Sequence, residues 1–231
     1  SEYTGVSTVG MTAASASAMA TRLANSASNA TDVAQVVREA RLVQVEAAVA
    51  RETAQLASGQ SLTRFMGVDI PANLPPPAAG WGYAPDLVKG AKTDAAAYAH
   101  MTGYQGEVRV AADAANRGEL VVSWGGKVGT QGADVISVNP KTGEVILYDA
   151  KTYSSATNVQ PSTTFAQDKP ALANARVQAE RAVRAANMPP ALKQQAIQNI
   201  LNGNFTTRTT NQGMGGSSPI AVKFCGHSVC P

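Results

Sequence analysis

Two apolar segments separated by a short polar turn stand at the centre of the chain, in the sequence GADVISVNPKTGEVILYDAKTY of residues 132–153. Short runs rich in Val and Ile, broken by Asn-Pro and Gly, predict a hairpin of two buried strands. Alternate residues of a strand face the same side, so Asp149 and Lys151 share a face with Leu147. The segment therefore predicts a buried hairpin that carries charged groups at one end.

The register of this hairpin decides whether a second acid joins that face. Pairing Val138 with Val145 leaves a six-residue turn and places Asp134 directly opposite Asp149. A slip of two residues would make the acids diagonal neighbours, and a slip of one would put them on opposite faces. Facing carboxylates repel each other, and a divalent cation between them would reverse this effect. The pattern predicts a metal site, with Lys151 within reach of a phosphate or an attacking water.

The segments around the hairpin predict a mixed α/β domain of modest size. Hydrophobic periodicity, together with turn-forming Gly and Pro, indicates the order α-β-β-β-α-α-β. The predicted helices cover residues 103–118, 168–187 (with Asp168 as N-cap) and 191–203, and the predicted strands cover 119–124, 133–138, 144–153 and 219–225. The acids Glu119 and Glu144 flank strands and are expected to be solvated.

Three regions follow from composition along the chain. Residues 1–60 are rich in Ala and Ser and predict a helical N-terminal region, with one long helix over 31–59. Residues 61–95 are rich in Pro and Gly and predict a linker without regular elements. Residues 96–231 hold the predicted α/β domain. No run reaches the ~20 apolar residues that a membrane-spanning helix needs, so no membrane span is expected.

Charge is unevenly distributed between these regions. The whole chain has a net charge of +3, but residues 97–231 contain 12 Lys or Arg against 8 Asp or Glu. A metal ion bound by some of these acids would leave the remaining surface more basic still. The balance favours a polyanionic partner, such as nucleic acid, for the C-terminal domain.

Asp134, followed about 15 residues later by Asp149-Ala150-Lys151, resembles the PD-(D/E)xK signature of restriction-endonuclease-like nucleases. The first acid follows Ala133 here, whereas the family usually has Pro-Asp. Glu107, in GYQGEVRVA, is similar to the acid that many of these nucleases carry on their first core helix. The resemblance implies a restriction-endonuclease-like core with an N-terminal helical extension.

The same resemblance implies a role for each of these residues. Asp134, Asp149 and the main-chain carbonyl of Ala150 would bind Mg²⁺, with Mn²⁺ as a possible substitute. Lys151 would orient or deprotonate the attacking water, and Glu107 would help to hold the metal or the water. The expected reaction is hydrolysis of phosphodiester bonds in DNA, with RNA such as transfer RNA as the alternative substrate.

The predicted helix after the hairpin offers candidate substrate contacts. Arg176 and Arg181 are positioned to follow a phosphate backbone, although a solvated helix face fits the pattern equally well. Gln178 is expected to reach the site, as a glutamine on this helix does in some relatives. Lys169 and Tyr153 are further candidates.

The Pro-rich junction ahead of the predicted nuclease resembles the architecture of bacterial polymorphic toxins. This resemblance implies delivery into the cytoplasm of a target cell by contact-dependent inhibition or type VI secretion. The N-terminal region would then contact a delivery component. A cognate immunity protein, expected to be acidic, would neutralise the toxin.

Two other hypotheses remain open at this stage. Cys225, His227 and Cys230, with His100, could ligate zinc, but their spacing matches no common zinc pattern, and a local disulfide or two inert thiols fit as well. The chain could also be a non-catalytic binding module, in which the hairpin charges are structural and the long Ala-rich helix mediates assembly.

Overall fold

The computed structural model describes residues 30–59, 62–83, 91–153, 169–213 and 221–225. These residues form a mixed α/β protein with four α-helices, a two-stranded sheet and a five-stranded sheet. None of the described helices is long and apolar enough to cross a membrane.

The five-stranded sheet has the order β3-β4-β5-β6-β7. Its strands are β3 (Leu120–Trp124), β4 (Val135–Val138), β5 (Val145–Tyr153), β6 (Phe205–Gly213) and β7 (Ala221–Cys225). β3, β4 and β5 are antiparallel, β6 runs parallel to β5, and β7 is antiparallel to β6. Parallel neighbours require a crossover connection, which α5 (Lys169–Ala185) and α6 (Pro190–Leu201) supply between β5 and β6.

Of the registers considered for the hairpin, the structure has the one that leaves a six-residue turn. Val138 pairs with Val145, and Val135 pairs with Tyr148. The strand β4 begins at Val135, two residues later than predicted, so Asp134 lies immediately before it. Continuing the same register places Asp134 opposite Asp149.

The strand β6 was missed, so the predicted order α-β-β-β-α-α-β is wrong by one strand. No regular element is predicted between residues 203 and 219, but FTTRTTNQG forms a nine-residue strand beside β5. Four β-branched Thr residues in this segment are typical of strands and were the available signal. The observed order of the C-terminal domain is α-β-β-β-α-α-β-β.

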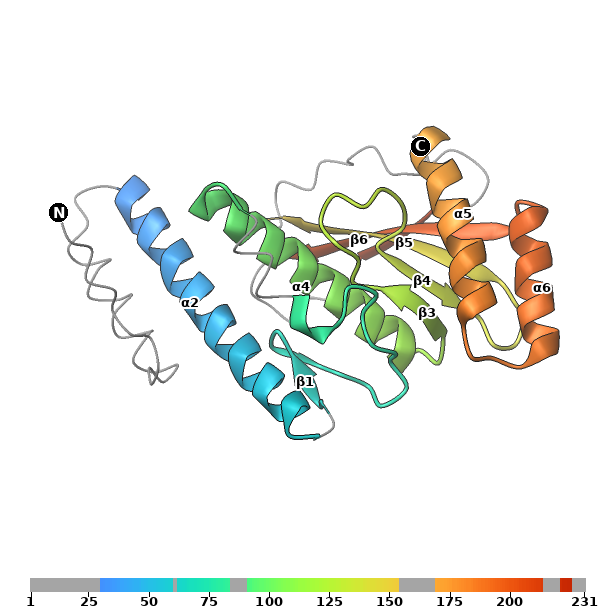
Figure 1. Cartoon of the computed structure of the whole chain (residues 1–231). Coiled ribbons are helices and arrows are strands. Elements are labelled where there is room, and N and C mark those ends of the chain that lie inside the picture. Colours follow the sequence, from blue (N-terminus) through green and yellow to red (C-terminus); the bar gives the residue numbers. More distant parts are fainter. Residues whose placement is uncertain (1–29, 60–61, 84–90, 154–168, 214–220, 226–231) are drawn as a thin grey trace.

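Helices cover both faces of this sheet (Figure 1). The helix α4 (Asp94–Asn116) packs on one face, where Val108 joins a core with Ile146 and Tyr148. It begins nine residues earlier than predicted, because Thr93 caps its N-terminus by accepting a hydrogen bond from the Ala96 amide. The helices α5 and α6 cover the other face, in a second core around Leu147.

The N-terminal helix α2 (Ala30–Ala57) contacts α4, and Figure 1 shows the two helices side by side. The segment predicted to be an irregular linker contains β1 (Arg64–Phe65), β2 (Val68–Asp69) and a short 3-10 helix (Trp81–Tyr83). Its residues Phe65, Met66 and Leu74 are buried in the same core as Tyr104 of α4. This segment therefore contributes to the core that supports the C-terminal domain.

The β1–β2 turn is held from both helices. Met66 has a φ of 50°, which is unusual for a residue other than glycine. Its amide donates to Glu52 of α2 at 2.9 Å, and its carbonyl accepts from Gln105 of α4 at 2.7 Å. Burial raises the pKa of Glu52 above its ordinary value. These contacts connect α2 to the core through specific polar groups.

The expectation that Glu119 and Glu144 are solvated is wrong. Glu119 is 8% exposed and lies next to β3, where it accepts hydrogen bonds from Tyr148 and Ser137. It also pairs with Arg117 at 3.0 Å and Arg208 at 3.5 Å. A buried carboxylate requires such partners, because its desolvation is otherwise too costly.

Glu144 is half-buried and accepts a hydrogen bond from the hydroxyl of Thr206. This contact joins the start of β5 to the start of β6. The partners of both glutamates come from strands distant in sequence, which local patterns do not reveal.

Substitution of Glu119 by Gln should lower the free energy of unfolding by about 3 kcal/mol, because it removes the buried negative charge that pairs with Arg117 and Arg208. The midpoint of urea unfolding measures the effect. The matched control is Asp69→Asn, which removes a solvent-exposed carboxylate paired with Arg64 and should not change the midpoint measurably. Equal shifts for the two variants would contradict a structural role for the Glu119 cluster.

Candidate functional site

The structure brings together Asp134 and Asp149 at the end of the β4–β5 hairpin. The Ala150 amide donates to Asp134 Oδ2 at 2.7 Å, and the Asp134 amide donates to the Tyr148 carbonyl at 2.9 Å. Asp149 lies within β5 and is only 5% exposed. Backbone hydrogen bonds of the hairpin therefore hold the first carboxylate beside the second.

The proximity of these carboxylates changes the acidity of Asp134. Burial and the neighbouring Asp149 raise the pKa of Asp134 to about 7, although the Ala150 amide and Lys151 oppose this shift. Two carboxylates in one low-dielectric site cannot both ionise at their ordinary pKa values. Near neutral pH, Asp134 therefore exists in both protonated and ionised forms.

Lys151 compensates part of this negative charge. Its Nζ lies 2.6 Å from Asp149 Oδ1, within an ion pair. The second oxygen, Asp149 Oδ2, is buried and accepts no hydrogen bond from the part of the chain that the structure describes. An unsatisfied buried carboxylate oxygen is costly, and a proton on Asp134 or a cation would satisfy it.

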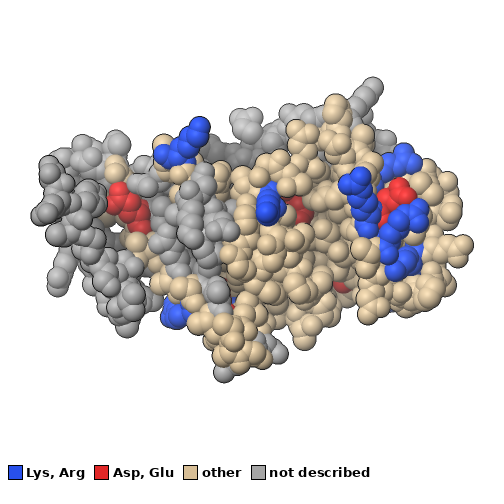
Figure 2. Space-filling view, in the orientation of Figure 1, with Lys and Arg blue, Asp and Glu red and all other residues tan. Residues whose placement is uncertain are grey.

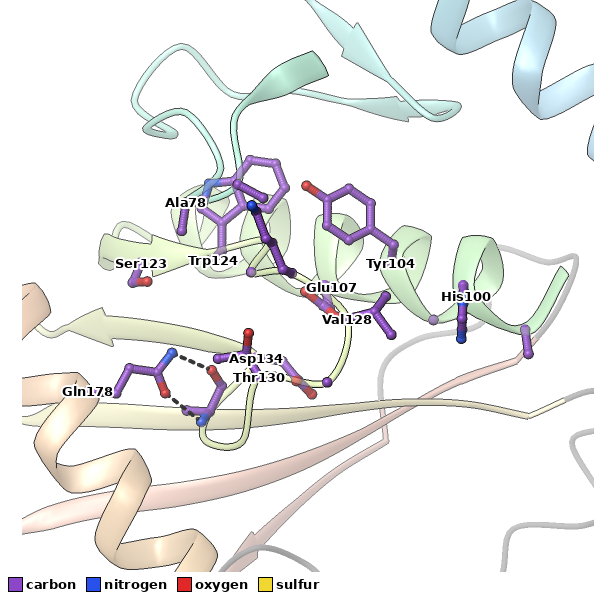
Figure 3. Close-up of a pocket in the computed structure, with 17 residues that line it drawn as sticks. Ala78, His100, Tyr104, Glu107, Ser123, Trp124, Val128, Thr130, Asp134 and Gln178 are labelled. Atoms are coloured by element: carbon purple, nitrogen blue, oxygen red, sulfur yellow. Dashed lines mark hydrogen bonds between the residues drawn. The ribbon is translucent and has the colours of Figure 1, made fainter. Parts of the chain in front are cut away.

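Glu107 joins the same electrostatic cluster from α4. Burial raises its pKa well above the ordinary value, the charge of Asp134 raises it further, and Lys151 opposes the shift. Figure 3 shows Glu107 on the helix that faces the loop leading to Asp134. The four residues predicted to form the site thus influence one another electrostatically.

A divalent cation is compatible with this set of donors. Among the described residues, no three Asp, Glu, His or Cys side chains converge closely enough to hold a metal ion as they stand. Mg²⁺, however, is usually bound in proteins through one or two carboxylates, with waters and substrate phosphates completing its shell. Asp134 and the unsatisfied oxygen of Asp149 fit this requirement.

A groove of about 500 Å³ opens beside the acids. Figure 3 shows it between α4 and the loop that joins β3 to β4, residues 125–134. Of the described site residues, Glu107, Asp134 and Gln178 line this groove, whereas Asp149 and Lys151 do not. The groove therefore gives access to the first carboxylate, whereas Asp149 is buried.

Gln178 of α5 is held against the segment before Asp134. Its Oε1 accepts from the Ala133 amide at 2.9 Å, and its Nε2 donates to the Ala133 carbonyl at 3.1 Å. Gly132 makes this approach possible, because a Cβ there would lie 2.1 Å from Gln178 Oε1 and its φ is +142°. Gln178 reaches the site, as expected, and positions the backbone next to Asp134.

The two candidate arginines have different surroundings. The Arg176 guanidinium donates to the Leu201 carbonyl at the end of α6, so this side chain is directed toward the neighbouring helix. Arg181 is exposed and lines a second cavity that also includes Gln178. Figure 2 shows basic side chains gathered over α5 and α6 around an acidic patch. Within this region, Arg184 pairs with Glu180 at 2.7 Å.

Several other candidates lie at the limits of the described residues. Lys169 is the first residue of α5 and Tyr153 the last of β5, but their side chains are not among the described ones. His227 and Cys230 also lie outside the described residues, and Cys225 ends β7. His100 lines the groove from α4, so the zinc hypothesis remains a prediction.

Sequence reasoning did not assign a site role to Tyr104, Trp124, Lys127 or Thr130, which line the groove. The Tyr104 hydroxyl is buried and has no hydrogen-bond partner in the described part of the chain. The glycine-rich stretch GGKVGTQG was the available signal for the loop that forms one wall. The residue order of this stretch does not match that of nucleotide-binding Walker loops.

Comparisons with protein-family models, curated proteins and solved structures found no match to this chain.

Substitution of Asp134 by Asn should stabilise the protein at pH 8 by at least about 1 kcal/mol and have a smaller effect at pH 5. Because the folded-state pKa of Asp134 is raised to about 7, its contribution to stability is present below pH ~4 and is lost as pH rises through 7. Urea unfolding of both proteins at the two pH values measures this difference. A wild type that gains stability relative to the variant between pH 5 and pH 8 would contradict the raised pKa.

A double-mutant cycle should show that Gly132 and Gln178 act together. Gln178→Ala should cost about 1–2 kcal/mol by removing two hydrogen bonds to Ala133. Gly132→Ala should also destabilise, through its positive φ and by displacing Gln178. The double variant should cost about 1 kcal/mol less than the sum of the single variants. Additive changes in the unfolding free energy would show that the two positions are independent.

Proposed function

We propose that the C-terminal domain is a metal-dependent endonuclease with a restriction-endonuclease-like core that hydrolyses phosphodiester bonds in DNA. The observation that carries this proposal is the pairing of Asp134 and Asp149 across the hairpin, with Lys151 bonded to Asp149. Buried like charges are costly for stability, and groups with strongly raised pKa values concentrate at functional sites.

Each residue at the hairpin end has its own role in the proposed reaction. Asp134, Asp149 and the Ala150 carbonyl would hold Mg²⁺ or Mn²⁺. A bound ion supplies Lewis-acid stabilisation of phosphate charge and lowers the pKa of water. Lys151, held at 2.6 Å from Asp149 as an ammonium, would orient the attacking water. Glu107 has a raised pKa and can carry a proton near the leaving group or position the water.

Substrate binding is assigned to the groove and to the neighbouring face of α5. Arg181 lines the second cavity and would contact phosphate, and Gln178 keeps the backbone of Ala133 in place beside the reacting centre. Arg176 donates to the end of α6, which supports a structural contribution from this side chain. Lys169 remains a candidate phosphate contact at the start of α5.

The biological role proposed for this nuclease is that of an antibacterial toxin. Support comes from the arrangement of a helical N-terminal region, a Pro-rich segment and a compact α/β domain that carries the paired acids. A delivery component of a contact-dependent or type VI system would engage the N-terminal region. A cognate immunity protein, with an acidic surface, would cover the basic face beside the site in the producing cell.

A non-catalytic binding module is the second candidate, and one observation favours it. Asp149 and Lys151 neutralise each other and do not line the groove, as a purely structural ion pair would. RNA remains the alternative substrate for a catalytic site, because a phosphodiester site of this composition does not by itself distinguish the two sugars.

Plasmid DNA and total transfer RNA, incubated separately with the full chain, should test these candidates. We expect DNA to be cleaved with Mg²⁺ and to remain intact with EDTA. Asp149→Ala and Lys151→Ala should each reduce the rate at least about 100-fold, the lower end of typical general acid–base contributions. The matched control, Lys141→Ala, removes an exposed lysine at the opposite end of the hairpin and should leave the rate unchanged.

Circular dichroism of each variant separates loss of chemistry from loss of fold. Cleavage of transfer RNA alone would retain the site and change the substrate. Two intact substrates, with folded protein and Mg²⁺ present, would reject cleavage of duplex DNA and of transfer RNA and favour the binding module.

A further inference from the structure

A second cavity, with a volume of about 630 Å³, adjoins the groove beside Asp134. The two cavities adjoin each other, because they share part of their lining, and together they are called here the channel. The shared residues are Ala78, Ser123, Thr130 and Gln178. The channel runs from α4, past the first carboxylate, to the exposed face of α5.

The wall formed by the β3–β4 loop is fixed at several points along its length. The Val128 amide donates to the Tyr83 hydroxyl at 2.9 Å, which ties the middle of the loop to the 3-10 helix. Farther along, Asn174 of α5 donates to Gln131 at 3.2 Å. A loop anchored on both sides gives a preformed channel, and preformed sites lose less conformational entropy on binding.

Basic side chains are few along the channel and lie at separate positions. Among the described residues that line it, Lys127 and Arg181 are the ones with a Lys or Arg side chain, and both are exposed. Much of the remaining lining is small or apolar, including Ala78 and the exposed side chains of Val128 and Val177, and the acids Glu107 and Asp134 also line it. This composition differs from that of a duplex-binding surface, which neutralises many phosphates at once.

The volumes of the two cavities also differ from what a duplex-binding surface would require. The two cavities, of about 500 and 630 Å³, have the volume of pockets that bury a single small ligand. Each can therefore take a group of nucleotide size. Sites for single-stranded nucleic acid combine a small number of phosphate contacts with apolar or aromatic surfaces for exposed bases.

We propose that the channel binds an unpaired, single-stranded segment of nucleic acid, with Lys127 and Arg181 on its phosphates and Asp134 between them. The inference rests on the proposed function for the position of the reacting phosphate and adds the class of substrate, a single strand. Unpaired DNA and unpaired RNA share the chemistry that the channel recognises, and the experiment distinguishes them.

Fluorescence anisotropy of labelled 12-mers tests the proposal, with the full chain kept in EDTA so that no hydrolysis occurs. The probes are single-stranded DNA, single-stranded RNA of the same sequence and the corresponding DNA duplex. At least one single strand should bind about tenfold more tightly than the duplex at the same salt concentration. A duplex that binds equally well or better, or a protein that binds none of the probes, would overturn the proposal.

Two channel variants and two matched controls locate the binding. Lys127→Ala and Arg181→Ala should each weaken single-strand binding severalfold and reduce the slope of log K against log salt by about 0.7. Lys141→Ala removes a comparable exposed loop lysine, and Arg184→Ala removes an arginine of α5 that pairs with Glu180. Both controls should bind as the wild type does. Equal losses in all four variants would mean that general surface charge, and not the channel, binds the strand.

Binding and cleavage outcomes are separable. Single-strand preference in EDTA without cleavage in Mg²⁺ would support the channel and reject the nuclease. Cleavage in Mg²⁺ without any single-strand preference in EDTA would support the nuclease and overturn the channel.

Discussion

The site depends on two carboxylates, of Asp134 and Asp149, that are held opposite each other at a buried hairpin end. Their repulsion and burial raise the pKa of Asp134 to about 7 and leave one oxygen of Asp149 without a hydrogen-bond donor from the described residues. Lys151 offsets part of the charge. The arrangement costs stability in the absence of a bound cation, which is the trade-off that preorganised charged sites commonly show.

The surrounding fold maintains this costly arrangement. Apolar residues of β4 and β5 fill cores on both faces of the sheet, and α4, α5 and α6 cover them. Gln178 extends from α5 to fix Ala133, and α4 carries Glu107 toward the same point. The β1–β2 turn packs against α4 through Phe65 and Met66. The acids therefore lie where the β4–β5 hairpin, α4 and α5 meet. Because each of these elements is anchored separately, the two carboxylates have little freedom to move apart.

Local sequence patterns predicted the hairpin and limited its register to a few alternatives, one of which makes the two acids face each other, because strand periodicity and turn length determine which residues lie opposite each other. They did not predict β6, whose Thr-rich sequence lacks an apolar run, or the burial of Glu119, whose partners come from distant strands. The linker prediction failed to anticipate that Phe65 is buried in the core. In each case, the deciding contact joins residues far apart in sequence, and a local pattern carries no information about such contacts.

The central claim, that Asp134 and Asp149 together bind a divalent cation, is tested most directly by titrating the full chain with Mn²⁺ and detecting free ion by electron paramagnetic resonance. We predict saturable binding that Asp134→Asn and Asp149→Asn each weaken at least tenfold. Binding should also release protons near pH 7, because the cation displaces the proton that Asp134 retains there. Absence of saturable binding, or binding that neither variant changes, would contradict the claim.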